Sequence, residues 1–253
     1  MTVSALSGVA ALGGHGGANA AEGGARDVYE LRSYTLETEA QKAGLEAFMA
    51  DACIPALNRL GITPVGVFET ADALSPVYVL LRHPSLESVA ALRPKLAGDA
   101  EYLSKGAAFL DAPAAAPAYK RVESSLLIAF TGMPQLEVPS KAPGRVLQLR
   151  IYESPSIKTN QKKIEMFNTA ELAIFRRTGL KAVFFGEAIA GAKMPNLTYM
   201  LSFDSPDAQK AAWDAFRADP DWLKLRAMPE YDDKAILCGI TNLLLKPAAC
   251  SQV

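Results

Sequence analysis

The sequence predicts an α+β protein made of two tandem ferredoxin-like domains. Three observations support this: a repeated strand motif, a constant distance between the copies, and one order of strands and helices within each copy. The motif Val28-Tyr-Glu-Leu-Arg-Ser-Tyr34 returns as Val146-Leu-Gln-Leu-Arg-Ile-Tyr152, with Val, Leu, Arg and Tyr in common. A repeat of this size indicates one structural unit built twice.

The distance between the two motifs, 118 positions from residue 28 to residue 146, also relates other parts of the chain. Further pairs of identical residues keep this distance, among them Arg59 and Arg177, Gly61 and Gly179, Val65 and Val183, and Glu69 and Glu187. One distance across separate elements favours a duplicated domain over chance similarity. The stretch 132–144, rich in Pro and Gly, then serves as a linker. We therefore predict domains at 27–131 and 145–247, with a tail at 248–253.

Each copy alternates strand and helix patterns in the order β-α-β-β-α-β, which is that of the ferredoxin-like unit. Gly61 follows the last apolar position of the first helix, where a left-handed residue ends a helix, and Pro94 is expected to break a later one. The expected strands are 28–34, 65–69, 77–82, 121–130, 146–152, 182–187, 198–203 and 236–245. The expected helices are 45–60, 86–93, 95–110, 164–178 and 208–216.

The first 26 residues differ in composition from the rest of the chain. They are small and apolar up to Leu12 and then mostly Gly and Ala. With the small-residue site Ala18-Asn19-Ala20, this pattern predicts an export signal and a periplasmic or extracellular protein. No basic residue precedes the apolar stretch, so the signal would be truncated at its start. A flexible tail on a cytoplasmic protein is the alternative.

The composition argues against several classes of partner. Lys and Arg number 26 against 27 Asp and Glu, so no net charge draws in nucleic acid. Three scattered cysteines and two histidines predict neither a disulfide framework, nor a metal site, nor a bound cofactor. No apolar run outside the first residues approaches the roughly 20 residues of a membrane span. A small-molecule ligand and a homo-oligomer remain as expected partners.

The two strand motifs, together with the segment Gly61-Ile-Thr-Pro-Val-Gly-Val-Phe-Glu69, resemble the NIPSNAP family over roughly residues 27 to 247. The second copy adds Ala218-Asp-Pro-Asp-Trp222, which is similar to an acidic, aromatic stretch of that family. The resemblance implies the dimeric α/β-barrel fold, here within one chain, but no single activity. The first copy has Asp99-Ala-Glu-Tyr102 in place of the family's stretch. The second copy is therefore the better candidate for a pocket.

The main candidates for a ligand site are Arg32 and Tyr34 with their counterparts Arg150 and Tyr152. Side chains alternate along a strand, so each Arg shares a face with its Tyr and not with the central Leu of the motif. We expect the Leu face to pack under helices and the Arg/Tyr face to line the seam between the two sheets. There an Arg beside a Tyr could bind a carboxylate or enolate. Alternatively, Arg32 pairs with Glu30 or another acid and has the structural role of satisfying the seam between the copies.

Four weaker candidates follow. Glu69 and Glu187 end corresponding strands and could form an acid/base pair across the barrel. His83 could serve as a general base, but its expected position between a strand and Pro84 makes a plain surface residue the alternative. Trp222, like Trp213, could line an apolar pocket or belong to the core.

Three functions remain open at this point. The first is binding of a small molecule or of a protein, without metal chemistry. The second is a cofactor-independent oxygenase or isomerase that acts on a small acidic or electron-rich substrate. The third is a haem-handling protein, for which the chain offers no good axial histidine.

Overall fold

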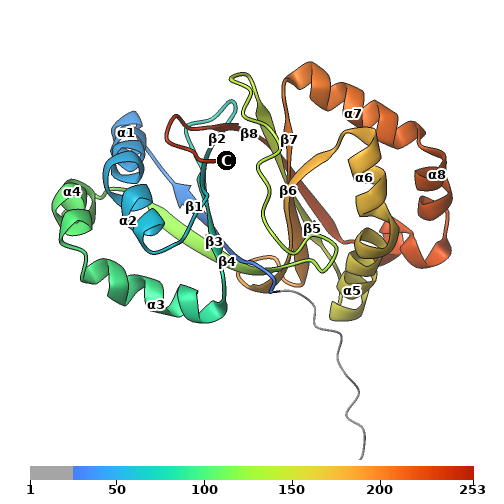
Figure 1. Cartoon of the computed structure of the whole chain (residues 1–253), viewed down its shortest axis with the longest axis horizontal. Helices are drawn as coiled ribbons and strands as arrows, with labels where there is room; N and C mark the ends of the chain where they lie inside the picture. The colour runs from blue at the N-terminus through green and yellow to red at the C-terminus, as the bar shows by residue number, and fades with distance from the viewer. Residues whose placement is uncertain (1–24) are drawn as a thin grey trace, which may run out of the picture.

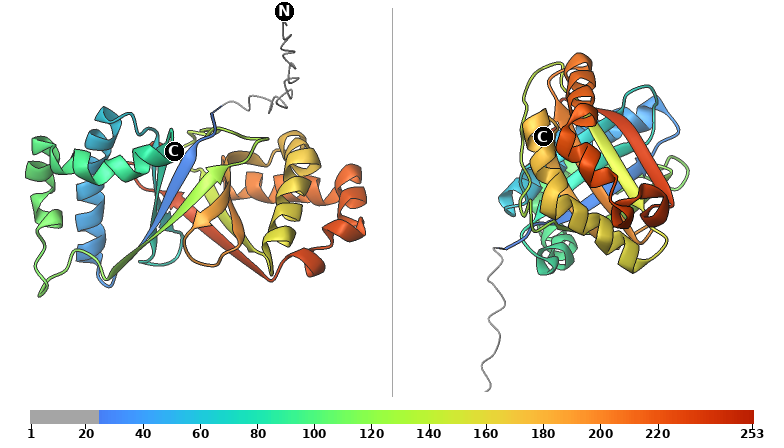
Figure 2. Two further views of the ribbon diagram at one scale, coloured as in Figure 1. Left: turned by 90° about the horizontal axis from the view of Figure 1, so that it is seen from below. Right: turned by 90° about the vertical axis from the view of Figure 1, so that its right-hand side faces the viewer.

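The computed structural model describes residues 25–253, so nearly all of the expected export signal lies outside the described residues. Eight antiparallel strands form one closed barrel in the order β1-β3-β2-β8-β5-β7-β6-β4. The helices of the first repeat cover one side of the barrel and those of the second repeat the other (Figure 1). The left view of Figure 2 again shows the two helical layers flanking the strands, and the right view looks onto the helices of the second repeat. Within 25–253, no helix is long and apolar enough to cross a membrane.

The two halves of the chain repeat one order of elements. The first half contains β1 (Val28–Thr35), α1 (Glu39–Phe48), the π-helical turn η1 (Met49–Cys53), α2 (Ile54–Arg59), β2 (Val65–Thr70), β3 (Val77–His83), α3 (Leu86–Ala97), α4 (Ala100–Leu110) and β4 (Arg121–Ala129). The second contains β5 (Val146–Glu153), α5 (Ile157–Met166), the π-helical turn η2 (Phe167–Glu171), α6 (Leu172–Thr178), β6 (Lys181–Ala190), β7 (Asn196–Phe203), α7 (Pro206–Ala218), α8 (Pro220–Arg226), η3 (Pro229–Tyr231), α9 (Asp233–Ile236) and β8 (Gly239–Pro247). The predicted α+β class and internal repeat are confirmed.

Hydrogen bonds between strands of different repeats close the barrel. β4 of the first repeat pairs with β6 of the second, and β8 of the second pairs with β2 of the first. Each repeat thus joins the other at both edges of its own four strands. A closed barrel leaves no unpaired edge that could recruit another chain.

Apolar side chains fill the inside of the barrel. Leu31 and Leu149 lie there with other buried residues from both repeats: Tyr29, Phe68, Leu80, Leu127, Leu147, Val183, Phe184, Met200 and Leu245. Our prediction that the central leucines of the two motifs face the helices is therefore wrong. Both faces of these strands are buried. The uncharged face lies inside the barrel, because a charged side chain in the apolar interior would need a buried partner.

The outward faces of the strands carry the second set of side chains. Tyr34 packs with α1 and α2 in the core of the first repeat. Tyr152 packs with α5 and α6 in the core of the second. The helix ends agree with the sequence pattern, because Gly61 and Gly179 have φ of 76° and 84°, the left-handed values expected where a helix stops.

Two smaller expectations need correction. Pro94 does not break a helix, because α3 continues through it and ends at Gly98. The segment 248–253 lies along β2 and is not a loose tail. Its Gln252 accepts a hydrogen bond from the backbone of Val65 at 2.8 Å, and Val253 is buried.

Candidate functional site

The four Arg and Tyr candidates lie on the outward faces of β1 and β5, beneath the helices. The seam between the sheets that we expected them to line is instead the apolar barrel interior, so that orientation is wrong. Arg32 and Tyr34 sit in the first repeat, and Arg150 and Tyr152 in the second, on opposite sides of the barrel. The structure therefore offers two separate environments, one for each repeat.

In the first repeat a carboxylate neutralises the arginine. Arg32 donates two hydrogen bonds of 2.8 Å to Glu30, one to each oxygen. Ser124 donates a third at 2.9 Å, and the ring of buried His83 lies 3.7 Å from the same carboxylate. Burial alone would raise the pKa of Glu30, but His83, Arg32 and Ser124 outweigh it and lower that pKa to about 2. The structural alternative, an Arg32–Glu30 pair, is confirmed.

In the second repeat the corresponding carboxylate is missing. The residues 118 positions after Glu30 and Ser124 are Gln148 and Asn242. Arg150 still lies opposite Asn242 in the strand register, as Arg32 lies opposite Ser124. Among the described residues, however, no acid forms an ion pair with Arg150, and its buried Nε atom has no hydrogen-bond partner. Its guanidinium instead stacks 5.0 Å from the ring centre of Trp213.

A chain of hydrogen bonds fixes the amide groups beside Arg150. Trp213 donates its indole N–H to Gln148 at 2.7 Å, and Gln148 donates to Asn242 at 2.7 Å. An indole N–H can only donate, so Gln148 must turn its oxygen toward Trp213 and its nitrogen toward the Asn242 oxygen. The side-chain amide NH2 group of Asn242 has no hydrogen-bond partner in this chain of bonds. This wall therefore presents N–H donors, which suit an oxyanion.

These residues line a cavity of about 330 Å³ between β5, β8 and the helices α7 and α8. We call it the arginine groove. Its lining residues are Gln148, Arg150, Trp213, Phe216, Arg217, Trp222, Arg226 and Asn242. Trp213 and Trp222 are on the same wall as Phe216, so the groove combines cationic groups with a row of aromatic rings. Trp222 does line a pocket, whereas Phe184 and Phe185 belong to the interior of the fold.

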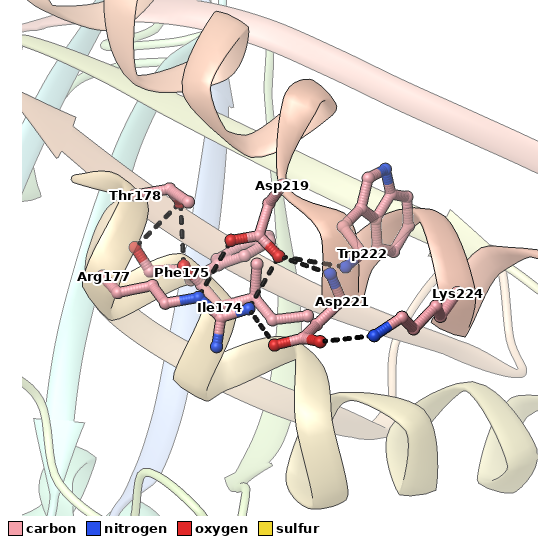
Figure 3. A network of polar contacts seen from close by, with 8 residues as sticks. All are labelled: Ile174, Phe175, Arg177, Thr178, Asp219, Asp221, Trp222 and Lys224. Atoms are coloured by element: carbon pink, nitrogen blue, oxygen red, sulfur yellow. Dashed lines mark hydrogen bonds and ion pairs between the residues drawn. The ribbon is translucent and has the colours of Figure 1, made fainter.

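A network at the start of α8 holds Trp222 in place (Figure 3). Asp219 accepts hydrogen bonds from the backbone N–H groups of Asp221 and Trp222 and so caps the helix. Arg177 at the end of α6 donates to Asp219 at 2.6 Å and to Asp221 at 2.8 Å. The acidic, aromatic stretch of the sequence thus links α6 to α8 and positions one wall of the groove.

A buried ionic cluster lies under the helices of the same repeat, and the sequence analysis missed it. Lys163 lies 3.6 Å from Glu171 and 3.1 Å from Asp233, and Lys163 and Glu171 are almost fully buried. Burial raises the pKa of Glu171 to about 7, with Lys163 opposing the shift. Next to them the hydroxyls of Tyr152 and Tyr199 are 3.0 Å apart.

The first repeat fills the positions of this cluster differently. Counting back 118 positions from Lys163, Glu171 and Tyr199 gives Leu45, Cys53 and Leu81, all buried. Since the fold is complete with these residues, the ionic cluster is not required for it. A comparison of the repeats at this distance would have revealed both the cluster and the exchange of Glu30 for Gln148.

The weaker candidates do not form a second site. Glu69 pairs with Lys42 of α1 at 2.6 Å. Glu187 is on β6, and three strands separate β6 from β2 in either direction around the barrel, so the two glutamates cannot act together. His83 is the last residue of β3, fully buried and 3.1 Å from Ser88, so its expected place at the surface is wrong.

A larger cavity of about 530 Å³ lies between α1, α4 and the segment 112–118 of the first repeat. Its wall is mostly alanine, glycine and phenylalanine, and its cation Lys105 pairs with Glu101 at 2.7 Å. Among the described residues that line it, Asp51 is the only charged group without an ion pair, so this cavity offers no unpaired cation for an anion. Residues 25–253 also contain no cluster of His, Cys, Asp and Glu arranged to hold a metal ion.

Fold and site together define a tandem-repeat α+β barrel with a cationic, aromatic groove in its second half. The NIPSNAP family model matches residues 29–131 and 147–252, and the chain belongs to that family. No curated protein sequence matches the chain.

Two solved structures share the fold over both repeats. One is a protein from Fusobacterium nucleatum named "putative monooxygenase", with 7% identity, 88% of this chain and 93% of that chain covered, and a TM-score of 0.59. The other is an anthrone oxidase-like protein with 10% identity, 89% and 93% covered, and a TM-score of 0.55. A NIPSNAP family protein from Agrobacterium tumefaciens matches 43% of this chain over 98% of its own, at 16% identity and a TM-score of 0.39.

Proposed function

We propose that the second repeat binds a small organic anion with an aromatic or apolar body in the arginine groove. The observation that carries this proposal is the contrast between two equivalent arginines. Arg32 has its carboxylate within the chain, whereas no described residue supplies one to Arg150. A ligand carboxylate or enolate would complete in the second repeat the pair that Glu30 completes in the first.

The energetics favour such a ligand. A partly buried guanidinium without an acid has lost water without gaining a counter-charge. A hydrogen bond to a charged group contributes roughly 1.5–3 kcal/mol, and a carboxylate can accept two from one guanidinium. The amino group of Asn242 offers a further donor, and the rings of Trp213 and Trp222 can cover the ligand's apolar part.

The two tryptophans of the chain, Trp213 and Trp222, both line the groove, so intrinsic fluorescence reports on this site. We expect benzoate to quench the fluorescence to saturation and uncharged benzyl alcohol to leave it unchanged. Arg150→Gln should abolish the benzoate response. Lys158→Gln, which removes an exposed cation from the same repeat, should preserve it. Equal responses of Arg150→Gln and the wild-type protein would contradict the proposal.

The buried cluster favours a second candidate, an isomerase-type enzyme that moves a proton on the bound anion. Glu171 has a pKa of about 7, suited to proton transfer near neutral pH. The Tyr152 ring is close to both the cluster and the groove, because its centre lies 5.7 Å from the Lys163 ammonium and 5.3 Å from the Arg150 guanidinium. If the protein is such an enzyme, it should speed exchange of the α-hydrogens of phenylpyruvate in D₂O, measured by NMR, and Glu171→Gln should remove the effect.

A further inference from the structure

We infer that the ligand of the arginine groove is a dianion, a planar body with a carboxylate at each end, one held by Arg150 and the other by Arg226. This inference rests on the proposed function of the groove and adds the class of ligand. The inference follows from three observations: two arginines of the groove have no ion pair, an aromatic row lies between these two, and the wall of the groove presents hydrogen-bond donors.

Three arginines line the groove, and only one of them forms an ion pair with an acid of the described residues. Arg217 donates to Asp214 at 2.5 Å. Arg150 and Arg226 form no ion pair with any acid in the part of the chain that the structure describes. Arg150 is partly buried, whereas Arg226 is exposed and lies at the open side of the groove, where a second ligand charge would find a cation that no described acid pairs with.

Two acids that share a small cavity with Arg226 make their hydrogen bonds to other groups. Asp232 and Asp233 line a small adjoining cavity of about 60 Å³ together with Arg226. Asp233 bonds the buried Lys163 at 3.1 Å, and Asp232 accepts a hydrogen bond from the backbone of Lys234 at the start of α9. Neither carboxylate is placed to neutralise Arg226, so this second cation is available at the α8 side of the groove.

An aromatic row separates the two cations. The guanidinium of Arg150 lies 5.0 Å from the ring centre of Trp213, and that of Arg226 lies 5.9 Å from that of Trp222. Phe216 is between the two indoles, 5.6 Å from Trp213 and 4.4 Å from Trp222 by ring centres. A planar conjugated body lying along this row would contact aromatic side chains with its faces and would extend from the Arg150 side of the groove toward Arg226.

The wall of the groove also selects for charge sign. The oxygens of Gln148 and Asn242 each already accept a hydrogen bond, from Trp213 and from Gln148 respectively, whereas the side-chain NH2 group of Asn242 is free to donate. The charged side chains that line the groove are all arginines, which repel an ammonium group. The volume, about 330 Å³, is at the small end of ligand sites and fits one ring with its substituents.

The test compares matched acids by calorimetry at one ionic strength on the whole protein. Terephthalate and isophthalate carry two carboxylates, whereas benzoate and 4-(hydroxymethyl)benzoate carry one. We expect one of the two dicarboxylates to bind at least ~10-fold more tightly than either monocarboxylate, which corresponds to about 1.4 kcal/mol. Arg226→Gln should remove this difference by weakening the dicarboxylate more than either monocarboxylate, and urea unfolding of the variant checks that it is folded. Lys158→Gln should keep the difference.

The outcomes separate the two claims. If benzoate binds and neither dicarboxylate binds more tightly, or if Arg226→Gln weakens benzoate and dicarboxylate equally, the dianion inference is overturned and the anion groove stands. If none of the four acids binds, both the inference and the proposed function are overturned. Dicarboxylate preference that survives in Arg226→Gln would assign the second charge to another residue and also overturn the inference.

Discussion

Arg32 donates hydrogen bonds of 2.8 Å to both carboxylate oxygens of Glu30, two residues earlier on the same strand face. The same two positions of the second repeat hold Arg150 and Gln148. A single exchange of acid for amide thus gives one fold two electrostatic states, a closed ion pair in one half and an available cation in the other. Duplication permits this, since the first copy alone can keep the structural pair.

The Glu30 ion pair should be important for stability. Glu30→Gln leaves Arg32 without its carboxylate under the helices, and breaking such a buried pair costs on the order of 3 kcal/mol. Urea unfolding measures the loss. The control is Glu37→Gln, which breaks an exposed pair with Lys120 and should cost about 0.5 kcal/mol or less. Similar losses in both variants would show that Arg32 is well solvated without Glu30.

The reverse exchange in the second repeat should close the groove. Gln148→Glu places a carboxylate beside Arg150 where the first repeat has Glu30, and it can still accept from Trp213. We expect benzoate affinity to fall at least ~10-fold, or about 1.4 kcal/mol, while stability to urea is unchanged or higher. Gln161→Glu adds the same charge on the exposed face of α5 and should not affect binding. Undiminished benzoate affinity in Gln148→Glu would mean that the anion does not use Arg150.

Much of the fold follows from local pattern. The repeat, the element order, and Gly61 as the residue that ends a helix depend on spacing and backbone conformation, which the sequence shows directly. Which face of β1 and β5 points into the barrel does not follow from local pattern. Period 2 separates Leu31 from Arg32, but both strand faces are buried, and only the tertiary structure decides which buried face is inside the barrel.

The site was predictable only in part, for a related reason. Arg150 was identified from its motif, whereas its partners come from distant elements: Trp213 from α7, Arg226 from α8 and Asn242 from β8. Absence of a partner is a property of three-dimensional packing and leaves no local signal. The buried Lys163 and Glu171 look like ordinary helix-surface charges in the sequence, because their burial depends on the segment that follows α8.

The position of the central leucines inside the barrel has a consequence for stability. Leu149 is fully buried inside the barrel, so Leu149→Ala should leave a cavity and cost roughly 2–5 kcal/mol. Ile157→Ala removes a side chain that is 68% exposed and should change stability by about 0.5 kcal/mol or less. Thermal or urea unfolding compares the two. A small loss at Leu149 would indicate that the barrel interior is not tightly packed.

The Glu171 carboxyl should make stability depend on pH. The charged and titratable groups facing it are Lys163 on α5, Asp233 on α9, Arg150 and Tyr152 on β5, and Tyr199 on β7. Burial raises the pKa of Glu171 to about 7, with the two cations only partly opposing it. The folded protein therefore holds a proton that the unfolded chain releases at its ordinary pKa near 4.5. The stabilisation is complete below that value and is lost as the pH rises through about 7.

Each unit of pKa shift is worth about 1.4 kcal/mol, so the loss between pH 4.5 and pH 8 amounts to roughly 3 kcal/mol. Glu171→Gln keeps a neutral side chain of the same size, and the wild-type protein should therefore lose stability relative to this variant as pH increases. Urea unfolding of both proteins at several pH values measures the difference. Glu165→Gln, at an exposed position of α5, serves as the matched control and should follow the wild-type profile at these pH values. Parallel profiles for the wild-type protein and Glu171→Gln would show that Glu171 is ionised in the folded state at every pH in this range.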